Sequence, residues 1–121
     1  MQSRNAKDIA IVDDDRRVLN SLANLLASCG YETRLFISAE LFLAADMSDF
    51  QCVVTDLGMR PIDGLEVLRR VLSRSDALPV IIITGKPGGS AESFYLGQGA
   101  AGFFRKPVDG DALIALIERL Q

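Results

Sequence analysis

Hydrophobic and polar positions along the chain fall into two patterns that alternate. Short runs of apolar and β-branched residues bounded by turn residues predict strands at Ile9–Val12, Tyr31–Phe36, Cys52–Thr55, Val80–Thr84 and Ala101–Arg105. Apolar residues at three- and four-residue steps predict helices that begin at or near Arg16, Ser38, Gly64, Ser90 and Asp109. Strands that alternate with helices in this way predict a parallel sheet covered by helices on both faces.

Capping and turn residues mark the ends of these segments. Ser38 and Asp109 precede helical patterns and suit the N-cap position. Gly30 suits the left-handed residue that closes the helix predicted from Arg16 to Cys29. The Gly- and Pro-rich run 85–89 predicts a flexible loop after the fourth strand.

The order of the strands follows from their apolar character and from the rules of connection. Val80–Thr84 is apolar on both faces up to its last residue, as in a central parallel strand. Right-handed crossovers leave few orders for five parallel strands. We predict a single α/β domain over residues 1–121, a flavodoxin-like (βα)5 doubly wound sheet in the order 2-1-3-4-5. In that order the first and third strands flank a crevice at their carboxyl ends, where ligands bind.

Carboxylates stand at both lips of this crevice. Asp13 and Asp14 follow the first strand, and Asp56 follows the third. A lone aspartate after a strand is more often a turn or capping residue, but three carboxylates this close cannot all stay ionised unaided. Oxygen ligands of this kind suit a hard divalent cation. The cluster therefore predicts a Mg²⁺ site, which Mn²⁺ would also fill.

Two further strand ends offer groups for the same crevice. Thr84 ends the fourth strand with a hydroxyl, and Lys106 follows the fifth with a compact positive charge suited to a phosphoryl oxygen. Taken singly, a threonine there reflects β propensity and a Lys-Pro pair is usually a loop. Together with Asp56 as a carboxylate nucleophile and a metal, they predict a phosphoryl-transfer site.

Composition narrows the class of protein. The net charge is -3 and the isoelectric point is near 4.8, which argues against nucleic-acid binding by this chain. There is no histidine, which removes histidine-based catalysis and most zinc sites. No apolar run is long enough to span a membrane. Cys29 and Cys52 lack a CxxC spacing and are expected to be buried free thiols, so we predict a cytoplasmic protein.

Residues 9–120 resemble the receiver domain of two-component response regulators, in particular of those with LuxR-type helix-turn-helix outputs. The resemblance rests on residues whose types and intervals fit the family: Asp13, Asp14, Asp56, Thr84, Phe103 and Lys106. It implies that Asp56 is the phosphoacceptor, Thr84 the switch hydroxyl and Phe103 the switch aromatic residue. It also implies a cis peptide bond between Lys106 and Pro107.

The same resemblance implies a ligand set and a partner. Mg²⁺ would be held by Asp14, Asp56 and the Gly58 carbonyl, with Asp13 acting through water. A sensor histidine kinase or a phosphotransfer protein would donate the phosphoryl group. Phosphorylation would draw Thr84 inward, let Phe103 turn and reshape the surface of the last strand and its two flanking helices. The chain would then be a phosphoacceptor with autocatalytic phosphorylation and dephosphorylation only, not an enzyme.

Other functions stay open at this point. The receiver could control transcription through an output domain outside this chain, or it could be a stand-alone adaptor or phosphate sink. A hydrolase of the haloacid dehalogenase type needs a second aspartate two residues after its nucleophile, where this chain has Gly58. A nucleotide binder needs a glycine-rich phosphate loop after the first strand, where this chain has three aspartates.

Two features depart from the family or go beyond its site. The family usually has proline four residues after the acceptor; here Arg60 stands there and Pro61 follows, which predicts an altered loop with a mobile charge. Phe94 and Tyr95 are adjacent, so one helix face cannot bury both rings. Ala91 and Leu96 are the expected inward residues. We expect at least one exposed ring, which forms the surface of a phosphorylation-dependent homodimer unless it folds back onto residues 97–99.

Overall fold

The computed structural model describes residues 7–74, 77–85 and 91–121. Its five-stranded sheet is parallel and has the predicted order, β2-β1-β3-β4-β5. The strands are β1 (Asp8–Val12), β2 (Thr33–Phe36), β3 (Phe50–Asp56), β4 (Val80–Thr84) and β5 (Gly102–Arg105). The helices are α1 (Arg16–Ser28), α2 (Ala39–Leu43), the short 3-10 helix η1 (Met47–Asp49), α3 (Gly64–Arg74), α4 (Ala91–Gly97) and α5 (Gly110–Arg119).

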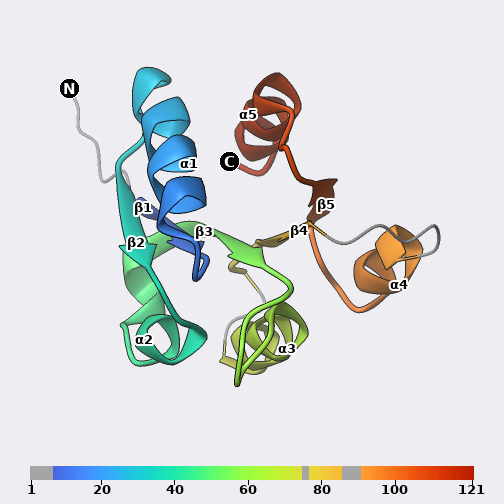
Figure 1. Ribbon diagram of the computed structural model, residues 1–121. Helices are drawn as coiled ribbons and strands as arrows, with labels where there is room; N and C mark the ends of the chain where they lie inside the picture. The colour runs from blue at the N-terminus through green and yellow to red at the C-terminus, as the bar shows by residue number, and fades with distance from the viewer. Residues whose placement is uncertain (1–6, 75–76, 86–90) are drawn as a thin grey trace.

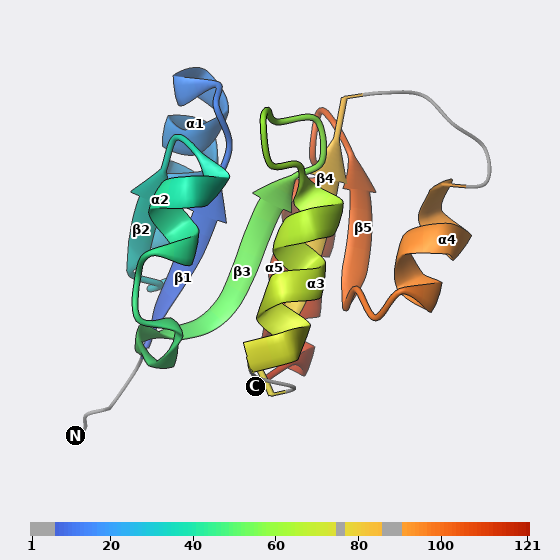
Figure 2. The same ribbon diagram turned by 90° about the horizontal axis from the view of Figure 1, so that it is seen from below.

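Helices cover both faces of the sheet, as the alternating pattern predicts. Helices α1 and α5 lie on one face, and α2 and α3 lie on the other (Figures 1 and 2). Successive residues of a strand point to opposite faces. Ile9 and Ile11 of β1 therefore join the core under α1 and α5, whereas Ala10 and Val12 join the core under α2 and α3.

Strands β1 and β5 each begin one residue away from their predicted starts, and β2 and β3 differ from prediction by two or more residues for identifiable reasons. Strand β3 is longer than Cys52–Thr55, because the Phe50 side chain is buried against α2 and Asp56 still pairs with Ile83 of β4. Strand β2 begins only at Thr33, because the Tyr31 N–H donates to the Leu26 carbonyl and completes the end of α1. Asp56 is therefore the last residue of its strand, fixed by the ladder.

The predicted helix caps are confirmed, but the predicted burial of one residue beside a cap is wrong. The Ser38 and Asp109 side chains accept hydrogen bonds from the backbone of the first turns of α2 and α5. Gly30 has a φ of 88°, in the left-handed region. The prediction that Cys29 is buried is wrong: α1 ends at Ser28, and Cys29 lies at its C-cap with an exposed side chain.

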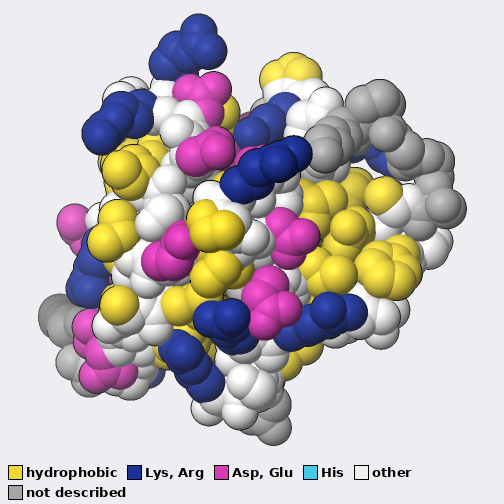
Figure 3. All heavy atoms as spheres, turned by 60° about the horizontal axis from the view of Figure 1, so that its bottom comes forward, with side chains coloured by type: hydrophobic (Ala, Val, Ile, Leu, Met, Phe, Trp, Pro, Cys, Tyr) yellow, Lys and Arg dark blue, Asp and Glu magenta, His cyan; other side chains and the backbone are white. Residues whose placement is uncertain are grey.

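Helix α4 corrects another expectation. Its first predicted residue, Ser90, and the loop 86–89 lie outside the described residues. Leu96 is 42% exposed and does not point inward as predicted; Tyr95 packs against the core with Ala91 instead. Phe94 is 49% exposed, so one ring of the pair is exposed as expected. Figure 3 shows hydrophobic side chains gathered on this side of the molecule.

Candidate functional site

The sheet brings the predicted polar residues to one edge. Asp13 follows β1 directly, Asp56 ends β3, Thr84 ends β4 and Lys106 follows β5. Because all five strands are parallel, these positions share the carboxyl edge of the sheet. One carboxylate oxygen each from Asp13, Asp14 and Asp56 lies within 4.8 Å of the others. The crevice predicted between β1 and β3 is therefore an acidic cluster.

Lys106 crosses the sheet to reach this cluster. Its Nζ lies 2.9 Å from Asp13 Oδ2 and 3.1 Å from Asp56 Oδ1. Partial burial disfavours the charge on Lys106, but the hydrogen bonds that the ammonium donates to these two carboxylates outweigh that effect and raise its pKa. Among the described residues, the ion pairs of the cluster join one ammonium to Asp13 and Asp56, so three carboxylates share a single paired cation there.

Asp13 is the deepest member of the cluster. Its side chain is fully buried, with Oδ1 accepting the Asp15 N–H at 2.8 Å and Oδ2 accepting Lys106 Nζ. Burial raises the pKa of its carboxyl group, and the hydrogen bonds from Asp15 and Lys106 oppose that rise. Both of its oxygens already have protein donors. Asp13 is therefore suited to an indirect role at a metal.

The donor set fits a hard divalent cation. Asp14 is exposed, and the Asp56 side chain keeps 10% of its surface open. The Gly58 backbone passes close to Asp56, since a Cβ built at Gly58 would lie 3.7 Å from Asp56 Oδ2. Carboxylate and carbonyl oxygens with an open side for water are what Mg²⁺ prefers. These residues thus match a magnesium centre in chemistry and in charge.

Thr84 and Phe103 lie at different depths. Thr84 is 2% exposed, and its carbonyl accepts the Lys106 N–H at 2.8 Å, which ties the ends of β4 and β5 together. Phe103 pairs in register with Ile82, two residues further from the edge, and belongs to the core under α2 and α3. The structure brings Thr84 to the edge that carries the acidic cluster and places Phe103 behind it.

The loop after Asp56 contains two features that sequence reasoning missed. The Arg60–Pro61 peptide bond is cis, as is the Lys106–Pro107 bond that the resemblance implied. Gly64 has no room for a side chain: a Cβ there would lie 2.6 Å from the Asp56 carbonyl oxygen and 2.8 Å from Leu57 Cα. A glycine as the first residue of a helix, directly after the capping aspartate Asp63, is the signal that could have indicated this close approach.

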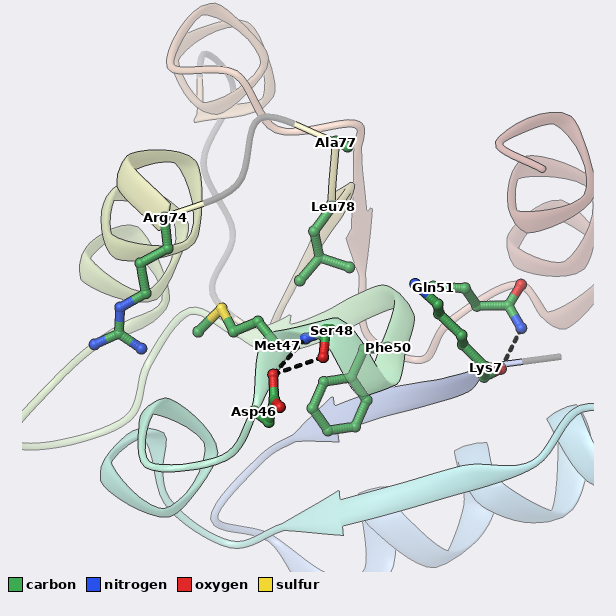
Figure 4. Close-up of a pocket in the computed structure, with 9 residues that line it drawn as sticks. All are labelled: Lys7, Asp46, Met47, Ser48, Phe50, Gln51, Arg74, Ala77 and Leu78. Atoms are coloured by element: carbon green, nitrogen blue, oxygen red, sulfur yellow. Dashed lines mark hydrogen bonds between the residues drawn. The ribbon is translucent and has the colours of Figure 1, made fainter. Parts of the chain in front are cut away.

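A separate hollow lies beside the start of β3 (Figure 4). Among its described lining residues the carboxylate is that of Asp46, which acts as a cap and accepts from the Ser48 N–H at 2.9 Å and the Ser48 hydroxyl at 2.7 Å. Gln51 donates to the Lys7 carbonyl. The described residues that line the hollow include none of the acidic cluster.

Comparison with known proteins identifies the family. The family model of the response regulator receiver domain matches residues 9–118. The chain belongs to the response regulator receiver family. It is 37% identical over 111 residues to the transcriptional regulatory protein FixJ of Bradyrhizobium diazoefficiens, covering 91% of this chain and 54% of that protein. The chain spans about half the length of the curated relatives it matches.

Solved structures agree with the fold of this receiver. The receiver domain protein from Clostridium thermocellum has a TM-score of 0.86 at 25% identity, covering 94% of this chain and 93% of that one. The receiver domain of NtrX from Brucella abortus has a TM-score of 0.84 at 32% identity, covering 93% and 97%. The predicted family and flavodoxin-like fold are confirmed, and this receiver falls outside the hydrolase and nucleotide-binding alternatives.

Within the described part of the receiver, no helix is long and apolar enough to cross a bilayer. The cytoplasmic location stays a prediction.

Proposed function

We propose that this receiver accepts a phosphoryl group on Asp56 from a sensor histidine kinase or a phosphotransfer protein. One observation carries the proposal: Asp56 is the strand-end carboxylate that both contacts Lys106, at 3.1 Å, and keeps part of its side chain open to solvent. Asp13 shares Lys106 but is fully buried, so an incoming phosphorus atom cannot reach it. Of the two, Asp56 is the one placed to react.

The transfer uses groups that the receiver already holds in position. An oxygen of Asp56 attacks phosphorus while the bond from phosphorus to the donor imidazole nitrogen breaks, and its electron pair stays on that nitrogen. Once Asp56 carries the phosphoryl group, the Lys106 ammonium would form its ion pair with a phosphoryl oxygen in place of the Asp56 carboxylate. The Thr84 hydroxyl would donate a hydrogen bond to another phosphoryl oxygen. In this proposal the chain acts as a phosphoacceptor with autocatalytic phosphorylation and dephosphorylation.

A divalent cation completes the proposed site. Asp14, Asp56 and the Gly58 carbonyl would hold Mg²⁺, with Asp13 acting through water, and Mn²⁺ would substitute. The cation supplies positive charge to the phosphoryl oxygens. The grouping of three carboxylates around the one ammonium that the described residues provide, and the exposure of Asp14, support this assignment.

Phosphorylation would be read at the surface of α4, β5 and α5. Thr84 moves toward the phosphoryl group, Phe103 turns, and the change in charge at one site biases a two-state equilibrium. The exposed Phe94 and its neighbour Tyr95 would then contribute to a homodimer of phosphorylated receivers. With its net charge of -3, the receiver itself would not bind nucleic acid.

The output of the signal is inferred from relatives. FixJ carries the name of a transcriptional regulator, and this receiver is similar to about half of it. We infer that the receiver controls transcription through an output domain outside this chain. The second candidate is a stand-alone adaptor or phosphate sink, and the reading frame that contains the receiver would separate the two.

Phosphorylation by acetyl phosphate in the presence of Mg²⁺ tests the site. Intact-mass measurement should show one added phosphoryl group on the wild type and on Asp111→Asn, a matched change at an exposed carboxylate of α5. Asp56→Asn should show none, since it loses the nucleophilic oxygen while keeping its shape. Full modification of Asp56→Asn would assign the acceptor elsewhere.

A further inference from the structure

The loop after Asp56 carries a positive charge that the proposed transfer does not use. Arg60 stands in this loop, which projects beyond the carboxyl edge of the sheet (Figure 2). Arg60 is exposed, and within the described parts of the chain no ion pair engages it. The nearby Asp63 serves as a cap, since its carboxylate accepts the Glu66 N–H at 3.0 Å. Among these residues, the Arg60 guanidinium is therefore left available to an anion from outside the chain.

Arg60 lines a hollow that opens beside the acceptor. The hollow has a volume of about 420 Å³ and is lined by residues 57–61, Asp63 and Tyr95. Small-molecule sites have volumes of roughly 300–1,000 Å³. Gly58 belongs to the lining, and a Cβ built on it would lie 3.7 Å from Asp56 Oδ2, so no side chain of this residue separates the carboxylate from the hollow. The hollow thus adjoins Asp56 on the side of Oδ2, whereas Lys106 pairs with Oδ1.

The geometry of phosphoryl transfer directs the leaving group toward this loop. The attacking oxygen, the phosphorus and the leaving atom lie roughly in line, so the leaving group points away from Asp56 and outward from the edge of the sheet. With an acyl phosphate, an Asp56 oxygen bonds to phosphorus while the P–O bond to the acyl group breaks, and the electron pair stays on the acyl oxygen. The product is a carboxylate. A guanidinium binds a carboxylate through two parallel hydrogen bonds.

We propose that Arg60 is a specificity-determining residue for the phosphodonor: its guanidinium binds the carboxylate that leaves from an acyl phosphate, and it favours such donors over those that release a neutral amine. The proposal rests on the phosphoacceptor role proposed for Asp56. Phosphoramidate is the contrasting donor, because its P–N bond breaks to release neutral ammonia, which gains nothing from a nearby positive charge. Both donors transfer the same phosphoryl group, so their comparison isolates the leaving group.

The expected effect is modest because Arg60 is exposed. An exposed ion pair shifts an equilibrium by up to about fivefold, and an interaction that strengthens as charge develops in the transition state raises the rate. Arg60→Gln should therefore lower the rate of phosphorylation by acetyl phosphate about two- to fivefold. The rate with phosphoramidate should not change. Arg60→Lys keeps the charge without the planar fork, so its acetyl phosphate rate should lie between those of Arg60→Gln and the wild type.

The test measures both rates by intact mass, in excess Mg²⁺ and over a range of donor concentrations. Carbamoyl phosphate also releases a carboxylate and should follow acetyl phosphate in every variant. Arg69→Gln is the matched control, because Arg69 is an exposed arginine of α3 that does not line the hollow. This control should keep both rates of the wild type. The phosphoramidate rate of Arg60→Gln also reports whether that variant is folded with an intact acceptor.

The outcomes separate this proposal from the role of Asp56. A slower reaction of Arg60→Gln with acetyl phosphate and carbamoyl phosphate, at an unchanged phosphoramidate rate, supports the role of Arg60. An equal or greater loss with phosphoramidate would mean that Arg60 acts on the phosphoryl group, and no loss with any donor would mean that it contacts no part of the donor. Either result overturns the proposal while Asp56 phosphorylation stands. A wild type that none of these donors modifies overturns both proposals.

Discussion

At the scale of single residues, Lys106 decides what the acidic cluster can do. The fully buried Asp13 is tolerable because it has Lys106 and the Asp15 N–H as partners; without them it would be an uncompensated buried charge. The pKa of Lys106 is raised above its ordinary value of 10.5. The charged Lys106 therefore contributes fully to the stability of the folded receiver below pH 10.5. This contribution is lost only as the pH rises through the higher pKa that Lys106 has in the folded state.

Asp14 is the exposed carboxylate of the cluster, so a substitution at this residue tests metal binding. Mg²⁺ should raise the Tm of the wild type because it binds the folded state. Asp14→Asn should abolish most of this shift, since a neutral amide is a much weaker ligand for a hard cation. Differential scanning fluorimetry with and without Mg²⁺ measures both. The control Asp111→Asn should shift like wild type; an equal shift in Asp14→Asn would remove Asp14 from the ligand set.

Single residues also mark the limit of what the sequence predicts. Residue types at strand ends predict that Asp13, Asp56, Thr84 and Lys106 lie at one edge of the sheet, because parallel strands end on the same side. The two ion pairs of Lys106 could not be predicted, because they depend on where a flexible side chain comes to rest across the sheet. Cys29 was misplaced because helical periodicity does not say at which residue a helix stops.

At the scale of elements, the strands were predicted better than their contacts. Apolar runs predict all five, and the larger shifts in their bounds occur where a backbone or side-chain contact decides the end of the strand, as with Phe50 in β3. Helix α4 was placed by its pattern, but its inward face was assigned to Leu96 and not to Tyr95. Spacing alone could not choose between adjacent residues, because the choice depends on Phe103 of β5 lying beneath the helix.

Gly64 joins two elements, because it starts α3 against the end of β3. Gly64→Ala would press a methyl group onto the Asp56 carbonyl and Leu57 Cα, which are backbone atoms that cannot move aside. We expect the free energy of unfolding to fall by about 1–3 kcal/mol. Urea denaturation measures this change, and slower phosphorylation should accompany it because the loop after Asp56 is displaced.

Gly97→Ala is the matched control. A Cβ at Gly97 meets nothing within 4 Å, so the stability should stay within about 0.5 kcal/mol of wild type. Equal effects of the two substitutions would show that the close approach at Gly64 does not constrain the loop.

At the scale of the whole molecule, the reaction of one cysteine measures exposure at the surface, and the reaction of the other measures opening of the core. Cys29 is exposed, whereas Cys52 is 2% exposed and burial raises the pKa of its thiol to about 12. A thiol reagent at neutral pH should modify Cys29 quickly and Cys52 only when the core opens. Mg²⁺ should slow the second phase, because it stabilises the folded receiver. Reaction of Cys52 as fast as Cys29 would contradict this.

Cys29→Ser serves as the control for that measurement. It should remove the fast phase and leave the slow phase, since the exposed serine changes no buried contact. The rate that remains then measures the opening of the sheet around β3.

The contact between Lys106 and Asp13 joins residues 93 positions apart. A nascent chain that has left the ribosome only as far as β4 already contains its acceptor and all three carboxylates, but it lacks the Lys106 ammonium that pairs with Asp13 and Asp56. Such an intermediate lacks the Lys106 ion pairs at its acidic edge, and β4, which can pair with β3, lacks its β5 neighbour. Contacts this distant in sequence form late in folding. The site can therefore accept a phosphoryl group only after β5 has joined the sheet and positioned Lys106. We therefore expect that an incompletely synthesised receiver does not compete with folded receivers for the phosphodonor.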